Sequence, residues 1–296
     1  MTLRLLTTLL LFWSSLPAQG TSRGFGFLEL PFSARNATLG EAMVADYSSA
    51  LSAHINPAIL ARVDFFSISL SHQRWIQDVQ SNFLFVSIPT SFVNAGLSVS
   101  MTSIGGIEVR DIPGPPSGEF TARSATIAGL VAFQYDPSLS FGASVKHVYE
   151  KIYIDEAASV LFDIGALYRT PIEGLSGGVS IRHFGIVDKM KERRSRPPTQ
   201  TAFGVSYRTA LDDFEMLGLV SAASGTASGS LRGQIGFECE YSQVISLRFG
   251  YQSEYEVRGF SFGVGVAYGL FSFDYGSIPF ATDLGNGHLI TVGIQM

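Results

Sequence analysis

Residues 234–241 read QIGFECEY, and this stretch decides the fold class. Every second residue, from Ile235 through Phe237 and Cys239 to Tyr241, is apolar or aromatic, whereas the residues between them are small, polar or charged. Apolar positions that recur with a period of two are typical of a β-strand that has one apolar and one polar face. The stretch therefore predicts a two-faced strand.

The same alternation recurs over residues 160–169, 246–252 and 260–268. Strands of globular proteins usually span about 5 to 6 residues, whereas strands that cross a membrane need about 9 to 11. The alternating segments favour the longer length. An apolar face on lipid and a small or polar face in the lumen is the pattern of an outer-membrane barrel. We therefore predict an all-β, antiparallel transmembrane β-barrel.

The spacing of turn residues sets the number of strands. Short joints such as Asp136-Pro137 alternate with longer ones such as 188–198, as in barrels with short periplasmic turns and longer outer loops. About fourteen strands result, an even number as in bacterial single-chain barrels. They are expected near residues 64–72, 80–88, 92–102, 123–135, 139–151, 158–169, 175–185, 199–209, 214–223, 230–241, 244–254, 258–268, 271–277 and 288–296.

The composition excludes several classes of protein. Of the 296 residues 46% are hydrophobic and only 15% are charged, which excludes a disordered chain. A single cysteine excludes a disulfide scaffold, and a net charge of −5 argues against a nucleic-acid partner. The sequence contains no stretch of 18 consecutive apolar residues, so no membrane-spanning helix is predicted.

The first 62 residues do not alternate. Residues 1–19 have the layout of a signal peptide, with Arg4 before the apolar run Leu5 to Trp13 and small residues around Ala18, so we expect export. Residues 20–62 carry small and apolar residues at helical spacing. We expect an extended start, two short helices and a turn that plug the lumen, followed by the barrel over 63–296.

Several side chains fall on the polar face of the predicted strands. We expect these to form internal salt bridges, with ion selectivity as the alternative: Lys146, Asp163, Arg182, Arg208, Glu238, Glu240, Arg248 and Asp274. His147 and His183 fall on the apolar face near strand ends. Cys239 faces lipid as a small inert hydrophobe.

Both ends of the chain resemble a known family. The N-terminal elements are Phe27-Leu28, Ser33-Ala34-Arg35, Leu39-Gly40, Asp46, Ser49-Ala50, Asn56-Pro57-Ala58 and Leu60-Ala61, followed by His72, Trp75 and Asp78 at the first hairpin. The C-terminal elements are Phe273-Asp274-Tyr275, Pro279-Phe280, Leu284-Gly285 and His288. This pattern resembles the PorV/PorQ family of outer-membrane proteins, which are similar to FadL-type barrels of fourteen strands.

The resemblance implies which residues matter and what they do. The family-motif positions of the plug and hairpin are Arg35, Gly40, Asp46, Asn56, Pro57, His72, Trp75, Asp274 and His288. It also implies a non-enzymatic component or accessory of type IX protein secretion and surface attachment, with secretion proteins or cargo as partners beside outer-membrane lipid. A basic loop could contact lipopolysaccharide or a partner protein, or be merely solvated: Lys189, Lys191, Arg193, Arg194 and Arg196.

Three other functions stay open. A FadL-like transporter of hydrophobic small molecules predicts an apolar lumen pocket near residues 27–60 and a kinked strand. An outer-membrane enzyme is disfavoured, because the G-x-S-x-G matches around Ser22, Ser176 and Ser261 lack the strand–turn–helix context of a nucleophile elbow. The histidines show no metal-binding spacing, so no catalytic residue, cofactor or metal is expected. A soluble secreted β-protein is the fourth possibility.

Overall fold

The structure is a computed structural model, and it describes residues 24–110, 114–187, 189–190, 193–194, 197–225, 230–253, 258–281 and 284–296. The expected signal peptide lies outside the described residues. No helix in the described ranges is long and apolar enough to cross a membrane.

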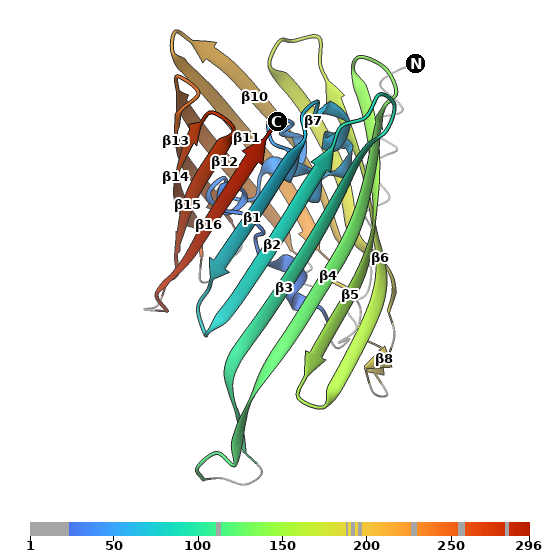
Figure 1. Cartoon of the computed structure of the whole chain (residues 1–296), viewed down its shortest axis with the longest axis vertical. Coiled ribbons are helices and arrows are strands. Elements are labelled where there is room, and N and C mark those ends of the chain that lie inside the picture. Colours follow the sequence, from blue (N-terminus) through green and yellow to red (C-terminus); the bar gives the residue numbers. More distant parts are fainter. Residues whose placement is uncertain are drawn as a thin grey trace.

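Fourteen strands form one closed antiparallel barrel (Figure 1). The strands are β1 (Ser67–Arg74), β2 (Val79–Ile88), β3 (Asn94–Val109), β4 (Gly118–Gln134), β5 (Leu139–Ile152), β6 (Asp155–Arg169), β7 (Leu175–Val187), β10 (Gln200–Leu211), β11 (Phe214–Gly225), β12 (Leu231–Tyr241), β13 (Ile245–Gln252), β14 (Phe260–Tyr268), β15 (Phe271–Pro279) and β16 (Asn286–Gln295). Two short strands, β8 (Lys189–Met190) and β9 (Arg193–Arg194), pair separately. The predicted fold class and strand count are confirmed.

The joints at the end of the barrel that holds the C-terminus are all short, whereas the longest joints, β3–β4 and β7–β10, lie at the other end together with the short β5–β6 turn. At the β4–β5 turn, Asp136 Oδ1 accepts hydrogen bonds from the backbone N–H groups of Ser138 and Leu139. Asp212 and Gly269 adopt positive φ angles of 52° and 59° in the β10–β11 and β14–β15 turns. Because short turns face the periplasm in such barrels, this end is periplasmic and the longer loops are extracellular.

One side of the barrel wall is much taller than the other. β3 and β4 have 16 and 17 residues, whereas β13 has 8. The β3–β4 hairpin extends far beyond its neighbours at the extracellular end (Figure 1). It is longer than predicted, since Ile107 still pairs with Phe120 beyond a register shift at Ile104.

The outer face of the strands is apolar. Large side chains such as Val264 and Phe262 on β14 are exposed, while Ser261 and Gly263 between them face the lumen. Burying this apolar belt in water-free hydrocarbon is favourable, and the closed ladder leaves no strand edge unpaired across most of the wall. The chain is therefore a β-barrel of the bacterial outer membrane.

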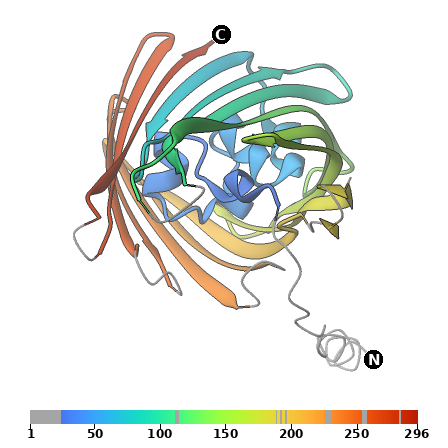
Figure 2. The ribbon, with the colours of Figure 1, turned by 90° about the horizontal axis from the view of Figure 1, so that it is seen from below.

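Residues 24–63 lie inside the barrel, where Figure 2 shows their short helices in the ring of strands. The helical turns are η1 (Gly26–Glu29), α2 (Ala34–Thr38), η2 (Met43–Ala45), η3 (Ala50–His54) and η4 (Pro57–Arg62). The expected extended start and two helices are wrong in detail. The Ser33 and Asn56 side chains accept hydrogen bonds from backbone N–H groups at the starts of α2 and η4, and Pro57 occupies the first turn of η4, so these residues define where the two turns begin.

A β-bulge interrupts β7. Phe162 of β6 pairs with Phe184, and Ile164 pairs with Ile181, so that two β7 residues oppose the single residue Asp163. The extra residue is His183, whose φ is +56°. Both Arg182 and His183 are consequently buried. The prediction that His183 faces lipid is wrong, because a bulge shifts the alternation by one residue.

Candidate functional site

The candidate site is the lumen, where the N-terminal segment rests on lumen-facing glycines. A Cβ at Gly142 would overlap the backbone of Pro57, and one at Gly165 would overlap the side chain of Asn56. The same holds for further lumen-facing glycines against this segment: Gly178, Gly236, Gly250 and Gly263. The missing side chains let helical turns lie directly against the wall.

The Asn56-Pro57 pair joins the segment to the wall. Asn56 Nδ2 donates to the carbonyl oxygens of Val44 at 2.8 Å and Ala166 at 3.0 Å. Its Oδ1 accepts from the Ala58 N–H at 3.1 Å, which caps η4. This single buried side chain therefore connects η2, η4 and β6.

Three motif residues meet in a buried ion-pair network. Arg35 Nη1 donates to Asp46 Oδ2 at 2.6 Å, while Arg35 Nε and Nη2 donate to both carboxylate oxygens of Glu238 at 2.9 and 2.8 Å. Arg248 pairs with the same Glu238 and donates to Asp274 Oδ1 at 2.5 Å. The predicted internal salt bridges are confirmed here, and the bidentate geometry fixes the orientation of α2.

The environment of Arg35 and Asp46 keeps both groups charged. Burial alone would lower the pKa of Arg35, but Asp46 and Glu238 outweigh it and raise that pKa. Burial alone would raise the pKa of Asp46, but the Arg35 guanidinium and the Ser48 hydroxyl hold that pKa below its ordinary value.

The backbone geometry at Gly40 explains why this motif position is a glycine. Its φ is +62°, and a Cβ there would overlap the carbonyl oxygens of Ile235 and Tyr251. No other residue type fits both the angle and the space. Gly40 thus lets the chain turn tightly between α2 and η2 against the wall.

The remaining motif residues lie apart from this network, at the extracellular rim. Trp75 packs edge-on against Phe280 at 4.9 Å, and the Arg258 guanidinium lies 5.6 Å from its ring centre. His72 and His288 are exposed on the outer face. In the basic loop, the backbones of Lys189, Arg193 and Arg194 belong to the β8–β9 hairpin, and Lys191 and Arg196 lie outside the described residues.

A second charged cluster lies beside the β7 bulge. Lys146 Nζ pairs with Asp163 Oδ2 at 2.7 Å, and Ser144 Oγ donates to the same oxygen at 2.6 Å. The other oxygen of Asp163 accepts the backbone N–H of His183 at 2.8 Å. The carboxylate therefore stabilises the bulge. Lys146 and Asp163 lie in the lumen as predicted, whereas His183 was not expected there, because nothing in the sequence marks an inserted residue.

The wall is incompletely paired next to this bulge. β7 pairs with β10 from Leu175 to Arg182, and its residues 183–187 have no strand partner on that side within the described chain. Thr199 Oγ1 donates to the His183 carbonyl at 3.1 Å, and the preceding residues Pro197 and Pro198 are buried. The β7 bulge is one of two register shifts in the described barrel, and it is the feature to compare with the kinked strand expected for a transporter.

The lumen holds a polar basin and two small cavities. The basin has a volume of about 370 Å3, opens toward the periplasmic turns and is lined by Arg35, Arg208, Glu238 and serine hydroxyls. The two cavities adjoin Phe32 and His54 and measure about 20 and 30 Å3. A wide apolar pocket near residues 27–60, expected for a transporter, is not open in this conformation of the described chain.

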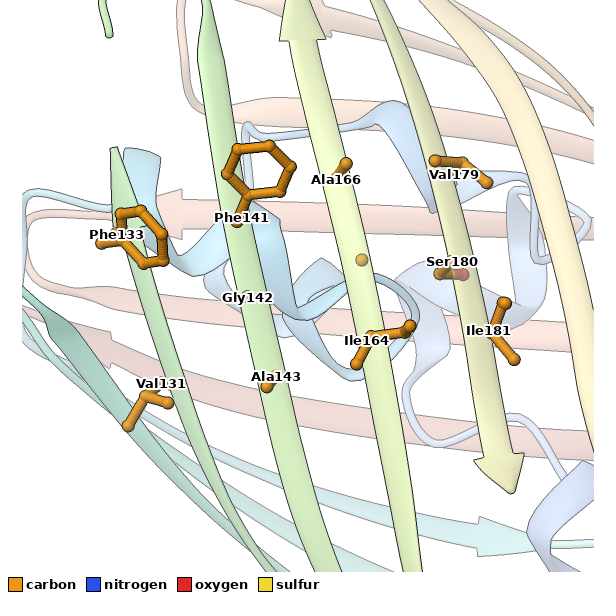
Figure 3. A pocket seen from close by; sticks show the side chains of 11 residues that line it. Val131, Phe133, Phe141, Gly142, Ala143, Ile164, Ala166, Val179, Ser180 and Ile181 are labelled. Carbon is orange, nitrogen blue, oxygen red and sulfur yellow. The ribbon is translucent and has the colours of Figure 1, made fainter. Parts of the chain in front are cut away.

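An apolar groove of about 470 Å3 lies on the outer wall, on β4 to β7 (Figure 3). Phe133, Phe141 and Ile181 border it, and the small residues of β5 and β6 form its floor. It lies opposite the place where η4 contacts Gly142 on the inner side. The groove faces hydrocarbon and continues the apolar belt.

The fold is similar to solved structures of outer-membrane channels. The Pseudomonas putida toluene transporter TodX matches at 12% identity over 89% of this chain and 97% of that chain, with a TM-score of 0.60. The CymD monoaromatic hydrocarbon channel matches at 12% identity over 89% and 96%, with a TM-score of 0.59. A Pseudomonas aeruginosa FadL homologue matches at 12% over 89% and 98%, with a TM-score of 0.53.

These identities are low, so the likeness shows the fold alone. No protein-family model and no curated protein matches the sequence. Within the described residues, no group of three or more His, Cys, Asp or Glu side chains could hold a metal ion.

Proposed function

We propose that the protein is a non-enzymatic passage for small hydrophobic molecules across the outer membrane. The observation that carries the proposal is the β7 bulge beside the unpaired edge at residues 183–187. Here residues 183–187 pair with β6 but with no strand on their other side within the described chain, where Thr199 bonds to the His183 carbonyl and Pro197 and Pro198 are buried. The fold likeness to channels for hydrophobic compounds supports the same function.

The passage is closed in the conformation described. The small cavities near Phe32 leave room for single water molecules and for nothing larger. Transport therefore requires the part of the segment before α2, residues 25–32, to move. Buried ion pairs of 2.6 and 2.8 Å hold α2 through Arg35, whereas the pair of Glu29 with Arg232 is longer, at 3.4 Å, and partly exposed, so we expect residues 25–32 to move while α2 stays.

The secretion role remains a second proposal, based on the resemblance of both chain ends to the PorV/PorQ family. The charged network at Arg35, Asp46 and Asp274 gives the resembling motif residues a structural role, and this role is equally compatible with a channel. Affinity capture from gently solubilised outer membranes, followed by mass spectrometry, distinguishes the two. Co-purified secretion components or cargo would favour the secretion role.

Uptake of labelled toluene tests the passage. The full chain is expressed in a bacterial host that lacks such a channel, beside an empty vector. We expect wild-type protein to raise the uptake rate several-fold. Deletion of His183 removes the inserted residue and restores regular pairing, so we expect uptake to return to the vector level.

A matched deletion controls for chain shortening. Pro115 lies in the exposed β3–β4 loop, far from the bulge, and its deletion is expected to leave uptake unchanged. Heat-modifiable migration on gels verifies that all variants fold. Wild-type uptake equal to the empty vector would contradict the proposal, as would full uptake by the His183 deletion.

A further inference from the structure

Three aromatic rings form a compact triangle in the lumen. The ring centre of Phe32 lies 4.7 Å from that of His54 and 5.2 Å from that of Phe83, and His54 and Phe83 are 5.0 Å apart. The rings meet edge-on or tilted, the geometry that aromatic pairs prefer. Phe32 belongs to the N-terminal segment, whereas Phe83 belongs to β2. The slot that the Phe32 ring fills is therefore shaped for an aromatic ring.

The two small cavities lie on either side of this slot. Both are lined by Leu28, Leu30, Phe32 and His54. One reaches Asn36 and the bulge residue His183, and the other reaches the hydroxyl-bearing wall of β2 to β4. Departure of the Phe32 side chain would join both cavities into one chamber of aromatic size.

Unsatisfied polar atoms border these cavities. Asn36 is 1% exposed and Thr126 is 5% exposed, yet Asn36 Oδ1 and Thr126 Oγ1 have no hydrogen-bond partner in the described chain. His54 Nδ1 is buried without a partner as well. Asn36 and His54 line the first cavity, and Thr126 lines the second. A buried polar atom without a partner is costly, so a ligand that supplies one is favoured.

Three of the cations around the chamber pair with carboxylates, and Arg182, which also lines the first cavity, donates to the side-chain oxygen of Gln200. Lys146 pairs with Asp163 at 2.7 Å. Arg232 pairs with Glu29 at 3.4 Å, and Arg258 pairs with Glu41 at 3.1 Å. An anionic or cationic ligand would add a buried charge without a free counter-ion, which is expensive. The chamber therefore suits a neutral molecule that carries a hydrogen-bonding group.

We propose that the lumen binds neutral hydroxylated aromatic molecules of the phenol class, with the ligand ring replacing that of Phe32. The ligand hydroxyl donates to Asn36 Oδ1 and accepts from His54 Nδ1, or it forms its hydrogen bond with Thr126 Oγ1 instead. This inference rests on the proposed passage function and specifies its substrate class. Phe32 is then a specificity-determining residue, because its ring competes with the ligand for the slot.

Titration calorimetry of the full-length protein in detergent, with phenol and toluene, tests the inference. These ligands are matched in size and differ by a hydroxyl in place of a methyl group. We expect Phe32→Ala to bind phenol more tightly than wild type does, and at least tenfold more tightly than it binds toluene. One net hydrogen bond supplies about that factor. Phe92→Ala is the matched control, since Phe92 is 90% exposed on a periplasmic turn.

Two variants remove the polar partners. Asn36→Leu and Thr126→Val, each in the Phe32→Ala background, retain side-chain size, and their combination is expected to abolish the preference for phenol. Toluene binding should persist in both variants. Retained toluene binding shows that the slot is intact even if a substitution lowers the stability of the protein. Loss of the preference with retained toluene binding would support the assignment of the hydroxyl partners.

The outcomes separate this inference from the proposed function. Equal or tighter binding of toluene by Phe32→Ala would overturn the phenol class and leave the passage standing. No saturable binding of either ligand, with toluene uptake intact in cells, would overturn the chamber alone. Absence of toluene uptake by wild type would contradict the passage itself, whatever the calorimetry shows.

Discussion

The N-terminal segment meets two different surfaces of the same lumen. The charged side consists of Glu238, Arg248 and Asp274 on β12 to β15, and these residues hold α2 through Arg35. The glycine side is the wall of β5 to β7, where η2 and η4 lie directly against Gly142, Gly165 and Gly178. Glycines of β12 to β14 also contact the segment, but there the ion pairs of Arg35 are added.

The contrast separates α2, which the charged side fixes, from residues 25–32, which precede it and border the cavity beside the bulge. Charged groups in a buried network require their partners, so the charged side tolerates little displacement. The glycine side depends on close approach and a few hydrogen bonds, and it adjoins the β7 bulge. We expect stability to depend mainly on the charged side and transport mainly on the neighbourhood of the bulge.

The largest effect is expected for Arg35→Met. This change leaves Asp46 and Glu238 buried beside a neutral side chain and should lower the free energy of unfolding by about 3–5 kcal/mol. Urea titration of the refolded barrel measures it. Arg110→Met is the control, because its pair with Glu108 is exposed, and little change is expected there. Equal effects of both changes would contradict the role of the charged side.

An intermediate effect is expected for Gly165→Ala. The new methyl group collides with Asn56 and should cost about 1–3 kcal/mol of unfolding free energy through overpacking. Gly129→Ala is the matched control, since no atom lies within 4 Å of a Cβ there. The same titration compares the two. If Gly165→Ala is as stable as Gly129→Ala, the segment does not rest on the glycine side as described.

A smaller, pH-dependent effect is expected from His54. Burial, helped by the charge of Lys146, lowers the pKa of His54 well below its ordinary value near 6.5. The unfolded chain therefore binds a proton below pH 6.5 that the folded chain does not. Stability from this group is complete above pH 6.5 and falls by up to about 1.4 kcal/mol per unit below it.

Unfolding titrations between pH 7.5 and about 5 measure this slope. We expect His54→Phe to reduce it, because phenylalanine keeps the ring packing and cannot take a proton. His72→Phe, at an exposed histidine, should leave the slope as in wild type. A slope that His54→Phe leaves unchanged would assign the pH dependence to other groups.

The smallest effect is expected for Cys239→Ala. Cys239 follows Glu238 directly but points to the opposite face of β12, and its side chain has no polar role. The free energy of unfolding should change by less than about 0.5 kcal/mol, as for surface positions generally. Glu238→Gln next to it should cost several times more. Similar losses for the two neighbours would mean that β12 does not separate lumen from lipid at this point.

The fold was largely predictable because the signal repeats. Several segments alternate clearly and turn residues separate the others, so the strand count is confirmed even though individual boundaries shift by a few residues. The β3–β4 hairpin was underestimated, because the proline- and glycine-rich stretch 112–118 suggested a long loop. Pairing continues through a register shift that no local pattern predicts.

The site was predictable only in part. Alternation placed Glu238, Arg248 and Asp274 in the lumen, and resemblance singled out Arg35 and Asp46, but neither indicated that they form one network. The bulge at His183 was missed, since an inserted residue changes the facing of side chains without a mark in the sequence. The glycines were visible in the composition, yet their role depends on which segment lies against them.

Hydrogen exchange followed by mass spectrometry, on the full-length protein in bilayers, tests the central claim most directly. That claim is that the charged side fixes α2, whereas the barrel wall is incompletely paired at the β7 bulge. We predict slow exchange over residues 33–40 and β12 to β14, and much faster exchange over residues 25–32 and the edge at 183–187. Equally slow exchange in all of these segments would contradict a passage at β7.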